Sequence, residues 1–314
     1  LVPRDVASRA AKERCDKGYG VNNTGLAVFL DFSEAINRLG KDVVAQRYGN
    51  LFDMYEEITD VSPYENPMMI YPAIHYTMGG IWVDYELMTS IKGLFAIGEC
   101  NFSDHGANRL GASALMQGLA DGYFVLPYTI QNYLADQITV PRFSTDLPEF
   151  AAAEKAVQEK IDWMMNIKGK KSVDSIHKEL GHIMWEYVGM GRTAEGLKEG
   201  LKKLKEVRKE FEKELFIPGD KEGMNVELDK AIRLYDFITM GELVAYDALN
   251  RNESCGGHFR EEYQTEEGEA KRDDENYFYV ACWEYQGSDE KEPVLLKEPL
   301  VYEAIKVQTR NYKS

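Results

Sequence analysis

The chain has 314 residues, of which 44% are apolar and 29% are charged, so it is long enough for two or three domains with real cores. Its 37 basic and 53 acidic residues give a formal net charge of −16. Such a surface repels phosphate backbones, which argues against nucleic-acid binding. No apolar run approaches the roughly 20 residues that span a bilayer as a helix.

The first hundred residues alternate between helical and strand patterns. Apolar residues at helical spacing predict a helix from Pro3 to about Lys17. Alternation over 26–32 predicts a strand, and a helical region then runs over 33–58 with a break near Gly40. Three short strands are expected next, in the segments MMIYPAIHY (68–76), GIWVD (80–84) and GLFAIGE (93–99).

The remainder of the chain is mainly helical. A helix is expected from about Leu110 through the 120s, and the prolines at 141 and 148 mark a linker. Amphipathic patterns with a charged outer face then predict a helical bundle, and YFYVACWEY near the C-terminus predicts a strand. The expected bundle helices are 149–167, 172–188, 193–215 and 225–250.

Several patterns in this chain resemble functional motifs but lack the flanking structure or spacing that those motifs require. The run GMGRTA at 189–194 matches a dinucleotide fingerprint, but the preceding residues are helical in pattern, so we expect a turn between two bundle helices. His177 and His182 lie five residues apart and do not share a helix face as a metal pair would. The four cysteines form no C-x-x-C pair and are expected to be reduced thiols.

The segment 93–126 has the pattern of a chemical site. An apolar strand is followed by a loop rich in glycine and polar residues, and then by a helix whose first turn carries free N–H groups. The small residues of the loop allow a flat or anionic group to approach the backbone. Arg109 lies among them, and no acidic residue lies within 105–116. This pattern favours a bidentate grip on a carboxylate.

This segment resembles the flavin-binding signature of the succinate dehydrogenase/fumarate reductase flavoprotein subunit family. Members carry G-E followed by H-G-x-N-R-L-G-x-N-S-L-L, and this chain has GE at 98–99 and HGANRLGASALM at 105–116. Further blocks follow the family order: PRDVASRA (3–10), YPAIHYTMGGIWVD (71–84), GHIMWEYVGMGR (181–192) and ALNRNESCGGHFREEY (248–263) with RDDENY (272–277). Two departures are Ser113-Ala114 in place of N-S, and Cys255 in place of an arginine.

The resemblance implies a reaction, a cofactor and a set of site residues. It implies interconversion of succinate and fumarate by hydride transfer to or from FAD. Arg4 would be the catalytic proton donor, and His75 and Arg109 would bind the substrate. Glu99 would accept hydrogen bonds from ribityl hydroxyls, while the backbone at Ala114 and Leu115 would meet the flavin edge.

The resemblance also implies an organisation for the chain. We expect an α+β fragment, because the chain opens without Met and the family's N-terminal half, with most of the FAD site, has no counterpart in it. Its parts would be the end of a capping domain (1–74), part of the FAD-binding domain (75–148), a helical bundle domain (149–250) and a small C-terminal domain (251–314).

The same resemblance bears on partners and location. The parent would dock on an iron–sulfur subunit and a membrane anchor subunit, passing electrons to quinone. It would lie peripherally at the cytoplasmic face of the inner membrane. The fragment alone is expected to be soluble, inactive, weak in FAD binding and prone to self-association through exposed strand edges.

Two other functions fit parts of the sequence. L-aspartate oxidase shares the blocks around Arg4 and Arg109, although the extended C-terminal segment with ESCGGH and RDDENY favours the dehydrogenase. A non-catalytic helical interaction module is the alternative from a different class. Flavin binding by the purified chain would count against that module.

Overall fold

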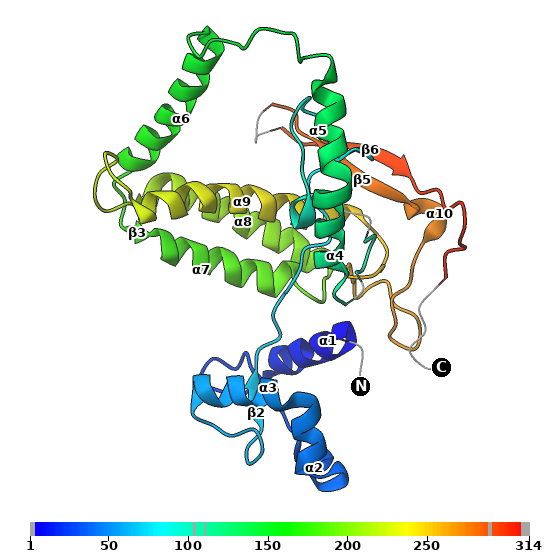
Figure 1. Cartoon of the computed structure of the whole chain (residues 1–314). Coiled ribbons are helices and arrows are strands. Elements are labelled where there is room, and N and C mark those ends of the chain that lie inside the picture. The colour runs from blue at the N-terminus through cyan, green and yellow to red at the C-terminus, as the bar shows by residue number, and fades with distance from the viewer. Residues whose placement is uncertain (1–3, 103–104, 110, 288–290, 309–314) are drawn as a thin grey trace. The chain divides into compact units, whose positions relative to one another are not determined.

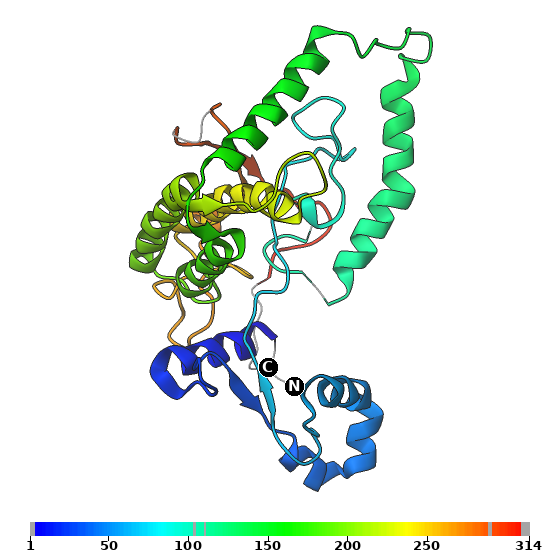
Figure 2. The ribbon, with the colours of Figure 1, turned by 90° about the vertical axis from the view of Figure 1, so that its left-hand side faces the viewer.

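A computed structural model describes residues 4–102, 105–109, 111–287 and 291–308, and it divides the chain into two compact units (Figures 1 and 2). Unit 1 is Leu1–His75 with Arg310–Ser314, and unit 2 is Tyr76–Thr309. Pro3 and Leu110, the predicted starts of two helices, lie outside the described residues. Helices and short strands both occur, in agreement with an α+β chain.

Unit 1 is a small helical unit with one pair of antiparallel strands. Its core contains the buried side chains of Val44, Phe52 and Met68, with Tyr64 and Phe32 packed around Phe52 at ring-centroid distances of 4.8 and 4.9 Å. The elements are α1 (Arg4–Arg14), a π-helical turn (Cys15–Tyr19), β1 (Val28–Leu30), α2 (Ser33–Leu39), α3 (Lys41–Thr59) and β2 (Met68–Ile70).

The predicted break between the two helices of unit 1 is confirmed. Gly40 separates α2 from α3 with a φ of 89°, a backbone conformation that side chains disfavour. The two strands pair in register through Phe29 and Met69, although both are shorter than the predicted segments 26–32 and 68–76.

Unit 2 opens with irregular chain where the sequence pattern predicted two strands. The expected strands at 80–84 and 93–99 are wrong, because these residues form only isolated bridges, Ile81 with Asn101 and Met88 with Phe95. A strand needs a hydrogen-bonded neighbour along its length. Here the backbone forms turns instead. The buried side chains of Val83, Leu87 and Ala96 form a small core that stabilises them.

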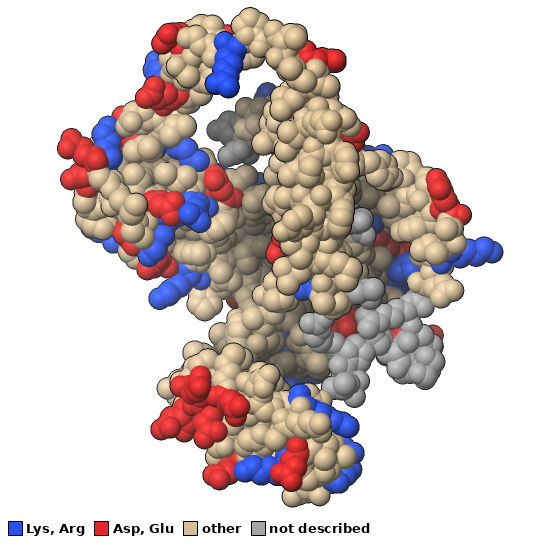
Figure 3. Space-filling view, in the orientation of Figure 1, with Lys and Arg blue, Asp and Glu red and all other residues tan. Residues whose placement is uncertain are grey.

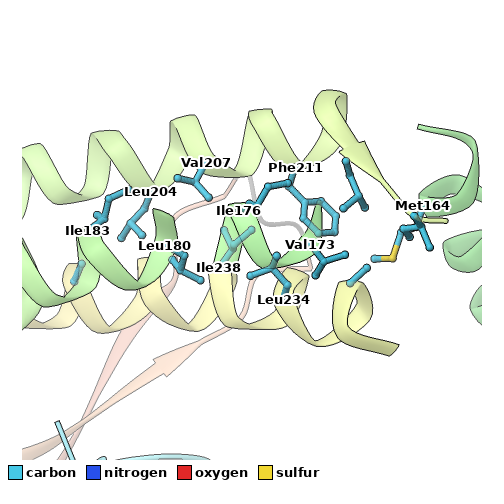
Figure 4. Packing of buried hydrophobic residues seen from close by; sticks show 14 of the residues in the cluster. Met164, Val173, Ile176, Leu180, Ile183, Leu204, Val207, Phe211, Leu234 and Ile238 are labelled. Carbon is cyan, nitrogen blue, oxygen red and sulfur yellow. The ribbon is translucent and has the colours of Figure 1, made fainter. Parts of the chain in front are cut away.

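A helical bundle forms the main core of unit 2. The buried side chains from α7, α8 and α9 point toward one another, and Met164 of α6 closes one end (Figure 4). Local caps begin these helices: Ser172, Thr193 and Asn225 each accept a backbone N–H at the start of α7, α8 and α9. The bundle elements are α6 (Pro148–Asn166), β3 (Lys171–Ser172), α7 (Val173–Ile183), α8 (Ala194–Glu214), β4 (Leu215–Phe216) and α9 (Val226–Asn250).

The bundle confirms the four predicted helices and the predicted turn between two of them at 189–194. That run lies between the π-helical end of α7 at Val188 and the start of α8 at Ala194, so no strand precedes it. A half-buried bidentate pair joins α8 to α9, since Arg208 Nε and Nη2 each lie 3.0 Å from a carboxylate oxygen of Glu242.

The C-terminal part of unit 2 is an antiparallel hairpin attached to α9. Trp283 of β5 donates to Asp247 of α9 at 2.7 Å, and Trp82 donates to Glu298 of β6 at 2.8 Å. These bonds connect the hairpin to the bundle and to the irregular segment that contains Trp82. The elements are α10 (Asp274–Tyr277), β5 (Tyr279–Glu284) and β6 (Val294–Pro299).

Two further helices, α4 (Ser113–Ala120) and α5 (Leu126–Ala135), carry an extended apolar surface. Leu115 and Met116 of α4 are 77% and 69% exposed, and Tyr128 of α5 is 67% exposed. In Figure 3 the surface over α5 is almost free of charged side chains. Within the described residues, no helix is long and apolar enough to cross a membrane.

Candidate functional site

Tyr76 stands at the centre of the candidate site, between the two segments that the sequence singled out. The guanidinium carbon of Arg109 lies 4.4 Å from the centre of the Tyr76 ring, within the range of a cation–π contact. The His105 ring meets the same tyrosine edge-on at 5.9 Å. The structure therefore brings the loop 105–109 against the segment that follows His75.

The electrostatics of Tyr76 reflect this position. Burial raises the pKa of its phenol, the nearby Glu99 carboxylate raises it further, and Arg109 opposes both. Tyr76 is therefore a neutral hydroxyl at physiological pH, with an anion and a cation close by. Sequence reasoning passed over Tyr76, whose only signal was its place directly after His75 in the block YPAIHY.

Glu99 lies in a 3₁₀ turn, Gly98–Cys100, rather than at the end of a strand. Its Oε1 accepts the backbone N–H of Thr77 at 3.2 Å, which fixes the carboxylate beside the Tyr76 segment. Gly98 has a φ of 72°, and a Cβ on Gly118 of α4 would lie 3.4 Å from the Gly98 Cα. The positive φ of Gly98 favours glycine at that position, and Gly118 lies in van der Waals contact with it, so the Glu99 turn packs on α4.

Ala114 and Leu115 lie in the first turn of α4. Ala112 precedes the helix in a left-handed conformation (φ 63°) and provides no side-chain cap. The N–H groups of a first helical turn have no acceptor within the helix, so their partial positive charge faces outward. The helix that carries Ala114 and Leu115 packs on the Glu99 turn, with Gly118 against Gly98.

Two predicted site residues belong to unit 1. His75 is exposed and is the last residue before the Tyr76 segment. Arg4 begins α1, and its side chain lies outside the described residues. Within α1, Arg9 and Asp5 lie one turn apart and form an ion pair at 3.7 Å.

A tight turn in the C-terminal part of unit 2, residues 255–258, contacts the Arg109 loop of this site. Cys255 and His258 exchange two backbone hydrogen bonds, of 2.8 and 3.0 Å, around Gly256 and Gly257. The Gly257 N–H then donates to the carbonyl oxygen of Ala107, in the Arg109 loop, at 2.7 Å. The sequence indicated this block only through its family resemblance and gave no sign of its contact with Ala107.

His258 is a half-buried, neutral histidine with a defined tautomer. Arg192 Nη1 lies 2.7 Å from His258 Nδ1, and an arginine only donates, so Nδ1 accepts and Nε2 carries the proton. Nε2 then donates to the Arg251 carbonyl at 3.0 Å. Burial, with the charge of Arg192, lowers the pKa of His258 from 6.5 to about 4. Burial also lowers the pKa of Arg192 to about 10.

Comparisons with known proteins agree in sequence and in structure. Residues 1–115 match the family model "FAD binding domain", and residues 177–312 match "Fumarate reductase flavoprotein C-term". The succinate dehydrogenase flavoprotein subunit of Bacillus subtilis is 33% identical over 264 residues, covering 84% of this chain and 44% of that protein. The fumarate reductase flavoprotein subunit of a Serratia species is 32% identical over 279 residues, with shares of 88% and 44%.

A solved structure of Escherichia coli quinol fumarate reductase superimposes with a TM-score of 0.80 at 28% identity, covering 98% of this chain and 50% of that one. The chain therefore spans about half the length, or slightly less, of the proteins that it matches.

The half-buried His258 predicts a pH dependence of stability. The unfolded chain protonates this histidine near pH 6.5 and the folded chain only near pH 4. The unfolded state therefore binds more protons between these values, and stability falls as pH drops through this window, by about 3 kcal/mol in total. Urea unfolding at pH 7 and pH 4.5 measures this loss.

The matched variants are His258→Gln and His182→Gln, the latter changing an exposed histidine of α7. We expect the first to flatten the pH dependence and the second to leave it unchanged. Equal pH profiles for wild type and His258→Gln would contradict the assignment.

Proposed function

The chain belongs to the succinate dehydrogenase/fumarate reductase flavoprotein subunit family, a family of FAD-dependent oxidoreductases, and we propose on this basis that it takes part in interconverting succinate and fumarate. The observation that carries the proposal is the placement of Arg109 and His105 on Tyr76, next to the turn that carries Glu99. This arrangement supports a cation that binds a carboxylate close to groups that bind a flavin.

Arg109 is the proposed clamp on one substrate carboxylate. A small dianion leaves water only where cationic or hydrogen-bonding groups replace its hydration. The Tyr76 ring supports the guanidinium and restricts its rotation, which lowers the entropy lost when a carboxylate binds in bidentate fashion. His75, adjacent in the chain, is the proposed second donor to the substrate.

Glu99, Ala114 and Leu115 are the proposed contacts with FAD. The Glu99 carboxylate is exposed and fixed through Thr77, as an acceptor for ribityl hydroxyls must be. The first turn of α4 offers N–H donors suited to a flavin carbonyl edge. These features fit the ribityl and ring end of the cofactor, and FAD when bound supplies the hydride donor or acceptor.

Arg4 is the proposed proton donor to the substrate carbon. Arginine is a poor acid near neutrality, so this function requires a relay that returns the proton. The ion pair between Arg9 and Asp5 on the same helix supports such a relay, because Asp5 follows Arg4 directly in the chain.

The proposed partners are those of a respiratory complex. Solved relatives are named as a quinol-fumarate reductase and as the Sdh1 complex of Mycobacterium smegmatis, which supports an iron–sulfur subunit, a membrane anchor and quinone as the electron path. A peripheral position at the cytoplasmic face of the inner membrane follows from that assembly. The apolar surface of α4 and α5 is the proposed packing surface for the rest of the FAD-binding domain, with self-association as its consequence in isolation.

The clamp predicts a specific kinetic defect. In the assembled flavoprotein, Arg109→Ala should raise KM for succinate by about 10- to 100-fold, because a charge-assisted hydrogen bond contributes about 1.5–3 kcal/mol. A succinate–dye assay gives KM, and Arg142→Ala, which changes an exposed arginine of the linker, is the matched control. An unchanged KM for Arg109→Ala would exclude the clamp.

The proton donor predicts a different defect. Arg4→Lys should lower kcat by about 100-fold or more while FAD stays bound, because general acid catalysis contributes roughly 10²–10⁴-fold. The flavin absorbance spectrum checks occupancy, and Arg38→Lys on α2 is the control. A variant that keeps over about a tenth of the wild-type kcat would refute this assignment.

Residues 1–314 alone should bind FAD weakly and be inactive. Flavin affinity depends largely on a glycine-rich turn between a strand and a helix that holds the pyrophosphate, and the one similar run in this sequence, 189–194, lies between bundle helices. Equilibrium dialysis with FAD tests this. Micromolar binding would show a more complete site and would also exclude the non-catalytic module.

A further inference from the structure

The glycine turn of the C-terminal part touches both segments of the candidate site. The Gly257 N–H donates to Ala107 O at 2.7 Å, across 150 residues of sequence. A Cβ on Gly257 would lie 2.6 Å from the Met78 methyl carbon. Ala107 lies two residues before Arg109, and Met78 two residues after Tyr76. The turn thus contacts the chain close to both members of the cation–π pair.

The approach of the turn to Ala107 is possible only for glycine at position 256. Gly256 has a φ of 58°, and a Cβ there would lie 2.1 Å from Ala107 O and 2.4 Å from its carbonyl carbon. Both atoms are backbone, so no side-chain rotation would relieve the overlap. Any larger residue at 256 would therefore push the Arg109 loop away from the turn.

The turn itself is held rigidly to the bundle. His258 closes it through two backbone bonds with Cys255, and its ring is fixed between Arg192 and the Arg251 carbonyl. Arg192 is anchored in turn, because its Nε donates to Val188 O at 2.9 Å, at the end of the π-helical turn after α7. A continuous series of hydrogen bonds therefore runs from the bundle to Ala107.

We infer that the Gly256–Gly257 turn, fixed by the contact of His258 with Arg192, is a positioning device that sets the place of Arg109 relative to the substrate carboxylate. This inference rests on the proposed function, since it assumes that Arg109 binds a dicarboxylate. Gly256, Gly257 and His258 act through Ala107 and are positioning residues that do not touch the substrate.

A pair of glycine variants in the assembled flavoprotein tests this inference. Gly256→Ala should raise KM for succinate by about tenfold or more with FAD still bound, and should weaken the binding of malonate, a non-reacting dicarboxylate, by a similar factor. Gly268→Ala is the matched control, because Gly268 also has a positive φ (80°) but its Cβ would lie 3.8 Å from the nearest atom, a side-chain oxygen of Gln264. Equal effects of the two variants on KM would overturn the inference.

A second measurement on the unmodified protein keeps the test open if Gly256→Ala does not fold. Hydrogen exchange of the Gly257 amide should slow by about threefold or more when malonate binds, because a fixed Arg109 loop holds its acceptor in place. The Gly268 amide, which donates to Thr265 O at 3.0 Å, is the internal control and should not change. An unchanged Gly257 rate at saturating malonate would overturn the inference.

The Arg109→Ala variant separates this inference from the proposed function. If Arg109→Ala raises KM while Gly256→Ala behaves like Gly268→Ala, the clamp stands and the positioning device is refuted. If Arg109→Ala leaves KM unchanged, the proposed function fails and the inference fails with it.

Discussion

The buried guanidinium of Arg260 connects the rigid part of this molecule to the part that carries the site. Its side chain is 2% exposed, and Nη1 donates to the carbonyl of Ala248, in the last turn of α9, at 3.0 Å. A cation at a helix C-terminus satisfies carbonyls that the helix leaves open and opposes the negative end of its dipole. The Arg260 backbone also pairs with the Ser254 hydroxyl, at 2.8 and 3.0 Å. The chain from Ser254 to Arg260, which contains the glycine turn, is thereby fixed to the bundle.

This anchoring matters because the candidate site is made of irregular chain. Residues 76–102 and 105–109 contain almost no regular secondary structure in the described part, so their backbone groups depend on distant partners. Ile81 exchanges bonds of 2.9 Å with Cys100 and Phe102, and Gly257 supplies the bond to Ala107. Irregular backbone allows Tyr76, Glu99 and Arg109 to meet from separate segments. The relative positions of these segments are then fixed by contacts with the bundle and not by a sheet.

The sequence predicted the helices well and the site only in part. Helical periodicity is local, so α6 to α9 appear within a few residues of their predicted bounds. The strands at 80–84 and 93–99 failed because apolar alternation does not reveal whether a partner strand exists. Arg109 and Glu99 stood out through a local motif. Neither the Tyr76 ring beneath Arg109 nor the Gly257 bond to Ala107 could be predicted, because both are contacts between distant segments.

The departure from the family pattern at Cys255 falls where a side chain matters little to the turn. Cys255 holds the turn through its backbone N–H and carbonyl, both paired with His258, and these bonds do not depend on the side chain. Burial raises the pKa of its thiol, so the residue is neutral at physiological pH. An arginine there would add a third cation beside Arg251 and Arg272, which already interact with Tyr277 O and Asp274. The chain therefore loses a charge at this position and keeps the geometry through which the turn reaches Ala107.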